Sequence, residues 1–394
     1  MPCWKLTHVK SKAVFIRVEK FSIKVDIWQI RRKFLFSIAG VASQRNAILS
    51  GEDKSIELVA EVCAVIGRLP CNGISVGLED DNQFILWHQR FVSVDFLLRP
   101  EVSLYFVDDT RAFFVETPSD LDLHNTEKHP FFYMAQQDFC THVIILPLEN
   151  FLILSNTVGE PKCQLTFLLH VARCGSTAVT QAIHSIPNWK VMSESCFIHK
   201  HIYQMEHKHK VILADYLKTE KFYRIGEAAI RFMFKDCPQG YNVFYKAFGL
   251  LDFCLIPLLS EKFPKHKIIT MHRDGQGTCK SHYKAFRDTY AYDFAAYALK
   301  NRLIYHVFHP LVCRVLFVVS NGMTSQFTGF LEETKCRDIF LYHFVRWVAN
   351  SIQYVTYAGT APNILSVMYE DFRSDKTATI TKVRGQDQVL GSQI

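Results

Sequence analysis

Between Lys162 and Tyr369, short apolar runs alternate with stretches of helical spacing, and this alternation constrains the fold more than any other feature. A parallel strand is buried on both faces and reads as a continuous apolar run, and a helix carries the chain back to the next strand. The expected strands are Gln164–Val171, Lys190–Met192, Asn242–Lys246, Lys267–Met271 and Ile364–Tyr369. The expected helices include Thr177–Ser185, Phe222–Phe234, Phe253–Phe263 and Thr278–Phe286. This pattern predicts a three-layer α/β domain with helices on both faces of a central parallel sheet.

The first 160 residues carry the pattern of a β-rich region. From Phe21 to Ile27 apolar and polar residues alternate, as in a strand with one buried face. Ser103–Val107 and Ala112–Val115 flank a polar segment and are expected to form a hairpin. No motif with a known chemistry occurs in this region. The sequence therefore predicts three parts: a β-rich region of unassigned role over 1–160, an α/β domain over 161–382 and a flexible tail over 383–394.

The composition argues against several classes of protein. Hydrophobic residues make up 49% and charged residues 21% of the 394 residues, which is typical of a globular protein. The net charge of +7 is too small to indicate nucleic acid binding, and it suits a small anionic ligand. The 12 cysteines are scattered and form no Cys-x-x-Cys pair, so we expect reduced thiols rather than a zinc site or a disulfide framework.

No segment of the sequence has the pattern of a signal peptide or a membrane span. The N-terminus, MPCWKLTHVKSKAVFIRV, has no apolar run of the required length. Leu311–Ser320 and His142–Leu154 are apolar but too short to cross a bilayer. We therefore expect a soluble, cytoplasmic protein.

The segment from His170 to Thr177 joins an expected strand to an expected helix and has the features of an anion site. The first amides of a helix have no partner inside the helix, and the helix dipole favours an anion there. Gly175 allows a ligand to approach the backbone, and Arg173 supplies a positive charge. Ser176 and Thr177 supply hydroxyl groups. The alternative is an ordinary strand-to-helix turn with a capping serine.

Two related motifs do not fit this segment. A Walker A loop needs a lysine directly after its second glycine, and none follows Gly175, so an ordinary ATPase is disfavoured. A cysteine phosphatase would need an arginine six positions after Cys174, where Thr180 stands. The start of a helix can activate a thiol, but we interpret Cys174 as a small loop residue.

A second strand, turn and helix start follow Lys267–Met271. Arg273 stands after the strand, and Ser281 stands eight residues later in the expected helix. This spacing can bring a guanidinium group and a hydroxyl group to one phosphate. The alternative is a surface arginine and a solvated serine.

Together these segments resemble the sulfotransferase family, whose members use 3'-phosphoadenosine-5'-phosphosulfate. Arg173–Thr177 resembles the family's loop for the 5'-phosphosulfate, and Arg273 with Ser281 resembles its pair for the 3'-phosphate. Asn363–Phe372 is similar to a late strand that ends in Tyr-Glu-Asp. The resemblance covers about residues 162–382 and implies a P-loop-type fold, this donor as co-substrate and no required metal. The donor-binding residues that it implies are Arg173, Cys174, Gly175, Ser176, Thr177, Arg273 and Ser281.

The sequence departs from the family's cytosolic phenol and steroid branch in two places. That branch carries Lys-Thr-His after the third strand, and here Lys246 is followed by Ala247 and Phe248. Its glycine-rich C-terminal segment is also absent after Val383. The acceptor therefore stays open as a hydroxyl or amine on a small molecule or a carbohydrate. Many relatives are anchored in the Golgi, so a Golgi location also stays open if the N-terminus is incomplete.

Two residues are candidates for the chemistry of transfer. Glu194 ends the strand after the loop helix, and the carbohydrate branches of the resembled family often place a catalytic glutamate there. It would remove the acceptor proton as general base, and the alternative is a helix cap or an ion pair with an arginine. Lys246 would stabilise charge on the bridging oxygen, and the alternative is a lysine that faces solvent. The histidines at 199, 201, 207 and 209 are expected on a solvated helix face.

Three functions are compatible with these residues. A sulfotransferase is the leading one. A kinase-like phosphotransferase would share the anion loop but would need a Mg²⁺ ligand and the missing lysine. A catalytically inactive nucleotide-binding protein could use its N-terminal region to bind a partner. No nucleic acid partner is expected, and the oligomeric state stays open.

Overall fold

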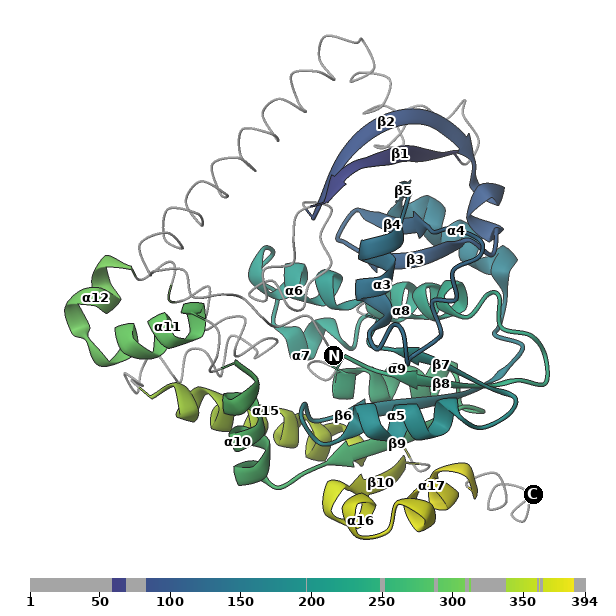
Figure 1. Cartoon of the computed structure of the whole chain (residues 1–394). Coiled ribbons are helices and arrows are strands. Elements are labelled where there is room, and N and C mark those ends of the chain that lie inside the picture. The colour runs from purple at the N-terminus through teal and green to yellow at the C-terminus, as the bar shows by residue number, and fades with distance from the viewer. Residues whose placement is uncertain are drawn as a thin grey trace.

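The computed structural model describes residues 59–68, 83–195, 197–248, 252–286, 290–308, 312, 338–359, 361 and 364–385. These residues form a mixed α/β structure around two five-stranded sheets (Figure 1). Sheet A has the strand order β2-β1-β5-β4-β3 and is antiparallel, whereas sheet B has the order β10-β9-β6-β8-β7 and is parallel. The strand predicted over Phe21–Ile27 lies outside the described residues.

Sheet A is built from the part of the chain that was predicted to be β-rich. Its strands are β1 (Val59–Arg68), β2 (Phe84–Ser93), β3 (Val102–Val107), β4 (Arg111–Glu116) and β5 (His142–Pro147). The predicted hairpin is confirmed, because Val107 pairs with Ala112 across an antiparallel β3–β4 ladder. The Asp108 carboxylate stabilises the hairpin turn by accepting hydrogen bonds from the N–H groups of Thr110 and Arg111, at 2.8 and 2.6 Å.

Three helices accompany the strands of sheet A, and the last of them leads the chain on to sheet B. They are η2 (Val94–Leu98), α3 (Phe132–Phe139) and α4 (Leu148–Val158). Phe114 on β4 and Phe151 on α4 both contact Phe232 on α8 (Glu220–Met233), each with ring centroids 5.1 Å apart. One cluster of buried apolar residues runs from Ala60 in sheet A to Val383 near the C-terminus. Sheet A and sheet B therefore share a core, with α8 between them (Figure 1).

Sheet B confirms the parallel sheet predicted from the apolar runs. Its strands are β6 (Gln164–His170), β7 (Trp189–Ser193), β8 (Asn242–Lys246), β9 (Lys267–His272) and β10 (Ile364–Met368). Each differs from its predicted bounds by at most one residue at either end. The central strands β6, β8 and β9 are buried along most of their length and so need a continuous apolar run, whereas β10 at the edge is largely half-buried or exposed.

The helices of this region follow the predicted pattern with local differences. They are α5 (Ser176–His184), α6 (His199–His207), α7 (Leu213–Tyr216), α8, η3 (Asp252–Leu255), α9 (Ile256–Lys262), α10 (Gly275–Phe286), α11 (Tyr290–Lys300), α12 (Arg302–Val307), α15 (Ile339–Ala358), α16 (Tyr369–Ser374) and α17 (Lys376–Gly385). The helix predicted over Phe253–Phe263 is divided into η3 and α9, because Pro257 stands in the first turn of α9 and is best tolerated at a helix start. Helix α17 includes the buried Val383, and residues 386–394 lie outside the described residues.

The strand order places a topological switch point between β6 and β9. From β6 the chain crosses to β7 at one edge of sheet B, and β8 then returns to lie between them. The next strand, β9, pairs with the other side of β6. Ligands of open α/β sheets bind where the connections leave in opposite directions, outside the carboxyl ends of the strands. The loops that follow β6 and β9 are therefore the first place to look for a site.

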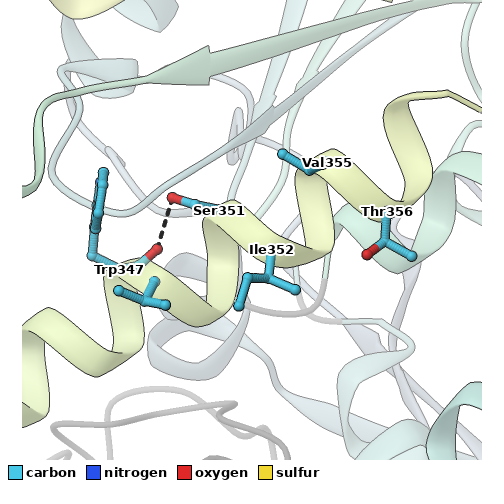
Figure 2. Close-up of a pocket in the computed structure, with 6 residues that line it drawn as sticks. Trp347, Ser351, Ile352, Val355 and Thr356 are labelled. Carbon is cyan, nitrogen blue, oxygen red and sulfur yellow. Dashed lines mark hydrogen bonds between the residues drawn. The ribbon is translucent and has the colours of Figure 1, made fainter.

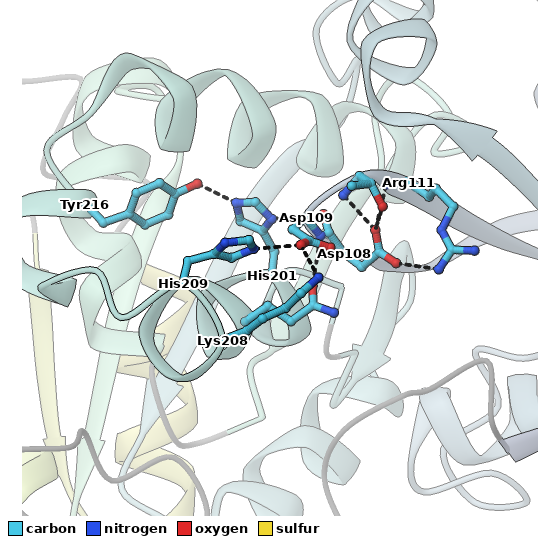
Figure 3. Close-up of polar contacts among 9 residues, drawn as sticks. Asp108, Asp109, Arg111, His201, Lys208, His209 and Tyr216 are labelled. Atoms are coloured by element: carbon cyan, nitrogen blue, oxygen red, sulfur yellow. Dashed lines mark hydrogen bonds and ion pairs between the residues drawn. The ribbon is translucent and has the colours of Figure 1, made fainter. Parts of the chain in front are cut away.

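The tip of the β3–β4 hairpin forms hydrogen bonds with α6 and with the residues that directly follow α6 (Figure 3). His201 is buried, with Nδ1 2.9 Å from the carbonyl oxygen of Asp108 and Nε2 in contact with the Tyr216 hydroxyl. The Asp109 carboxylate accepts hydrogen bonds from Lys208 and His209 at 2.6 and 2.7 Å. The prediction of a solvated histidine face is wrong for His201, and also for His199, which is 3% exposed. His201 is buried by its contacts with Asp108 and Tyr216, and the His199 ring lies 5.8 Å from the ring of Phe248, which follows β8. Periodicity reveals neither set of contacts.

Candidate active site

The loop between β6 and α5 has an unusual backbone. Arg173 has φ of 65° and Gly175 has φ of 86°, so both lie in the left-handed region. Glycine adopts this conformation readily, but for arginine it costs about 1–3 kcal/mol. Such strain persists where the surroundings impose it, and it is common at ligand sites. The loop leaves the Arg173 side chain exposed at the start of α5, where helix N–H groups have no partner inside the helix.

The loops after β6 and β9 meet through Arg173. The Arg173 guanidinium donates a hydrogen bond from Nε to the Ser281 hydroxyl oxygen at 3.1 Å. In return, Arg273 donates from Nη1 to the Arg173 carbonyl oxygen at 3.0 Å. The two anion sites predicted from the sequence therefore lie together at the switch point, although they are about 100 residues apart in the chain.

Aromatic side chains fix the position of Arg273. Its guanidinium carbon lies 4.3 Å from the centre of the Tyr369 ring, within the range of a cation–π contact. The Trp347 indole on α15 donates a hydrogen bond to the Arg273 carbonyl oxygen at 3.0 Å. Asp274 caps α10 by accepting a hydrogen bond from the Gly277 N–H at 2.6 Å. Arg273 thus contacts Tyr369 at the start of α16 and Trp347 on α15.

Gly175 packs against the same tyrosine. A Cβ atom at Gly175 would lie 2.7 Å from a ring carbon of Tyr369, closer than side chains approach one another. Tyr369 follows β10 and belongs to the third segment of the sequence resemblance. All three segments therefore converge on one point, with Tyr369 between Gly175 and Arg273.

We expect Gly175→Ala to lower the melting temperature and to weaken anion binding at this loop. Gly240→Ala is the matched control, because Gly240 has φ of 85° and no atom within 4 Å of a built Cβ. The control should destabilise by about 1–2 kcal/mol through backbone strain alone. Gly175→Ala should destabilise by about 1–3 kcal/mol more, because the Tyr369 ring must move. Equal melting temperatures for the two variants would show that the contact with Tyr369 is unimportant.

Glu194 and Lys246 form an ion pair at the ends of β7 and β8. The Lys246 side chain is 1% exposed, so the alternative of a solvent-facing lysine is wrong. The Lys246 ammonium also donates a hydrogen bond to the Thr177 hydroxyl oxygen at 3.1 Å. Glu194 has φ of 56°, and its N–H donates to the Lys246 carbonyl oxygen at 2.8 Å. The pair therefore adjoins the start of α5. It lies at the carboxyl ends of the strands of sheet B, as the two arginines do.

Cys174 does not have the environment of a nucleophile. It is fully buried, and burial raises the pKa of its thiol to about 11 despite hydrogen bonds from the backbone and from Ser176. The thiol is protonated at neutral pH, and a protonated thiol is a poor nucleophile. Its environment agrees with the interpretation of Cys174 as a small loop residue.

Two aromatic residues around this site carried no signal in the sequence analysis. Trp347 contacts Arg273, and Phe131 has its ring 5.6 Å from the Lys246 ammonium. Phe131 precedes α3 and so comes from the part of the chain that builds sheet A. Aromatic residues are common in cores, so only the tertiary contacts distinguish these two.

Trp347 also begins a shallow apolar groove along the outer face of α15 (Figure 2). The groove has a volume of about 270 Å³. Its lining residues are Trp347, Val348, Ser351, Ile352, Val355 and Thr356. It contains none of the residues predicted to bind an anion.

Within the described parts of the chain, one group of side chains has metal-ligand atoms within 4.8 Å of one another, namely Glu61, Cys63 and His88 on sheet A. His88 Nδ1 lies 3.0 Å from the Glu61 carboxylate, as in an ordinary ion pair. The same ranges contain no helix that is long and apolar enough to cross a membrane.

No protein family model matches the chain, and no curated protein matches it. Among solved structures, the chain is similar to the crystal structure of a sulfotransferase from Alicyclobacillus acidocaldarius, with 14% identity and a TM-score of 0.30. The similarity covers 58% of this chain and 81% of that chain. A likeness of this size assigns neither a family nor a function, so the functional argument rests on the geometry of the site.

Proposed function

We propose that the protein is a sulfotransferase that moves a sulfuryl group from 3'-phosphoadenosine-5'-phosphosulfate to a hydroxyl or amine acceptor. The observation that carries the proposal is the contact of Arg173 with both Ser281 and the Arg273 guanidinium. It joins two loops, each with an arginine, at the switch point of a parallel sheet, and this arrangement suits a ligand with two separate phosphate groups. In this proposal sheet B has the P-loop type of α/β fold.

The donor binds across both loops. Arg173, Gly175, Ser176 and Thr177 hold the 5'-phosphosulfate at the start of α5, with Cys174 contributing its backbone. Arg273 and Ser281 hold the 3'-phosphate. Charge-assisted hydrogen bonds from arginine to phosphate are short and strong, and the two loops present them without a metal ion.

The pair of Glu194 and Lys246 carries out the transfer. The acceptor oxygen or nitrogen attacks sulfur, a new bond to sulfur forms, and the bond from sulfur to the bridging oxygen breaks. Glu194 accepts the acceptor proton as general base. Lys246, next to Thr177, stabilises the negative charge that develops on the bridging oxygen as 3'-phosphoadenosine-5'-phosphate leaves. Phe131 and the neighbouring residues of α3 would then face the acceptor, which gives the N-terminal region a role.

Binding of the product nucleotide tests the proposal without knowledge of the acceptor. We expect saturating 3'-phosphoadenosine-5'-phosphate to raise the melting temperature, because a ligand at 100 times its Kd adds about 2.7 kcal/mol to stability. ATP, with or without Mg²⁺, should raise it little. A larger shift with ATP and Mg²⁺ would favour a kinase-like phosphotransferase instead. Nucleotide binding without transfer to any acceptor would favour an inactive nucleotide-binding protein.

A further inference from the structure

A glutamate, a cysteine and a histidine meet on the β1–β2 ladder of sheet A. Glu61 and Cys63 stand two residues apart on β1, so their side chains point to the same face of the strand. His88 on β2 is the cross-strand partner of Cys63. Its Nδ1 lies 3.0 Å from the Glu61 carboxylate, and the ligand atoms of all three side chains lie within 4.8 Å of one another. A carboxylate, a thiol and an imidazole are therefore brought together in the two strands at one edge of the sheet (Figure 1).

A β-bulge in β2 turns His88 toward the other two side chains. Cys63 pairs with His88, where an unbroken ladder would pair it with Gln89. Without the extra residue, His88 would point to the opposite face, because successive side chains of a strand alternate between faces. Bulges are common beside functional sites, where they redirect a side chain. The bulge is thus an observation, separate from the residue types, that favours a ligand at this point.

The burial of the group favours a metal ion over a simple ion pair. Glu61 and Cys63 have no exposed surface, and Cys63 belongs to a cluster of buried apolar residues. A buried charge destabilises a fold unless it is balanced, and a divalent ion bound by a thiolate, a carboxylate and a neutral imidazole leaves no net charge. The pair of Glu116 and His142 on the same sheet differs in this respect. Its carboxylate is 15% exposed and also forms an ion pair with Arg99 at 3.3 Å.

We propose that Glu61, Cys63 and His88 bind one zinc ion, which joins β2 to β1. Zinc accepts thiolate, imidazole and carboxylate ligands at about 2.0–2.3 Å in a tetrahedral arrangement, and the thiol releases its proton on binding. Such bonds place the ligand atoms about 3.3–3.5 Å apart, so side-chain movements of about 1 Å would close the site. With the three ligands that the described residues provide, a water molecule would complete the tetrahedron.

The sequence analysis predicted no zinc site, because it searched for the spacings of cysteine-rich zinc motifs. Here the ligands are Glu-x-Cys on one strand and a histidine on the next, a pattern that only the strand pairing reveals. The inference does not depend on the proposed function. The residues proposed for transfer lie at the carboxyl ends of the strands of sheet B.

Zinc and cobalt binding to the full chain test the site. After treatment with a chelator and dialysis, the chain should bind one Zn²⁺ tightly, and added Zn²⁺ should raise its melting temperature. Co²⁺ should produce the near-ultraviolet absorption band of a cobalt–thiolate bond. Cys63→Ser should abolish this band and weaken Zn²⁺ binding by at least about 100-fold, since loss of outer partners of a site already costs about 10- to 100-fold. Cys140→Ser is the matched control, because Cys140 is equally buried in the same apolar cluster, and it should leave both measurements unchanged.

His88→Asn distinguishes a zinc ligand from a simple partner of Glu61. If His88 binds zinc, the variant should lose the rise in melting temperature that Zn²⁺ produces in the wild type. If His88 only pairs with Glu61, the variant should be less stable by the same amount with and without Zn²⁺. His142→Asn is the control, because it removes the comparable pair with Glu116 and should keep the full response to Zn²⁺.

Either of two results would overturn the inference. One is a wild-type chain whose melting temperature does not respond to Zn²⁺, and the other is a Cys63→Ser protein that keeps the cobalt–thiolate band. If Cys63→Ser does not fold, the response of His88→Asn decides, because the His88 side chain is 16% exposed on an edge strand and tolerates substitution better. Neither result bears on the proposed function, which nucleotide binding tests separately.

Discussion

Glu194→Gln is expected to lower the rate of sulfuryl transfer by roughly 10²–10⁴. Glutamine keeps the shape of the side chain but cannot accept the acceptor proton. Donor binding should persist, because Arg173, Ser281 and Arg273 keep their mutual contacts. The measurement is the release of 3'-phosphoadenosine-5'-phosphate at saturating donor, with a panel of hydroxyl and amine acceptors.

Glu194→Gln also removes the charged partner of Lys246, so the variant is expected to change stability as well as rate. Lys246 is almost fully buried, and a buried cation without a charged partner destabilises a protein. Some loss of melting temperature is therefore expected even if Glu194 is the base. Glu227→Gln is the matched control, because Glu227 forms an ion pair with Arg231 at 2.6 Å on α8, outside the site. A Glu194→Gln protein that binds the nucleotide, is less stable and transfers at the wild-type rate would show that Glu194 has a structural role only.

Sheet B was predictable because its strands obey a local rule. A strand covered on both faces must be apolar at nearly every position, and the five runs in this sequence are bounded by polar or turn residues. The loops after β6 and β9 were predictable for a similar reason, since a glycine and charged residues directly after a strand indicate where a ligand can approach. The meeting of those loops follows from the parallel order of the strands.

The surroundings of the site were not predictable, because they depend on tertiary contacts. A lysine at the end of a strand looks the same in sequence whether it faces solvent or, like Lys246, is buried against a glutamate. Nothing in the sequence places the Tyr369 ring directly against Gly175. The burial of His201 depends in the same way on Asp108 and Tyr216, which are distant from it in sequence.

Arg273→Ala is expected to weaken binding of 3'-phosphoadenosine-5'-phosphate by about 10- to 100-fold, from the loss of a charge-assisted contact of about 1.5–3 kcal/mol. Adenosine 5'-phosphate, which lacks the 3'-phosphate, should lose much less. A small loss is expected even there, because Arg273 also donates a hydrogen bond to the Arg173 carbonyl oxygen and so supports the first loop. Calorimetry with both nucleotides gives the ratio of the two losses of affinity. A much larger loss for the bisphosphate would identify Arg273 as the 3'-phosphate ligand.

Arg273→Lys separates two proposed roles of this side chain, namely binding of the 3'-phosphate and positioning of the Arg173 loop. Lysine keeps the positive charge, but it lacks the planar donors that reach the Arg173 carbonyl oxygen and stack on Tyr369. If the charge on the 3'-phosphate dominates, the lysine variant should retain most of the preference for the bisphosphate. If positioning of the Arg173 loop dominates, both variants should lose affinity for the two nucleotides equally, and Arg273 would then be a positioning residue and not the 3'-phosphate ligand. Because the contact with Arg173 holds the loop in its left-handed conformation, the second result would also predict lower melting temperatures for both variants without any nucleotide.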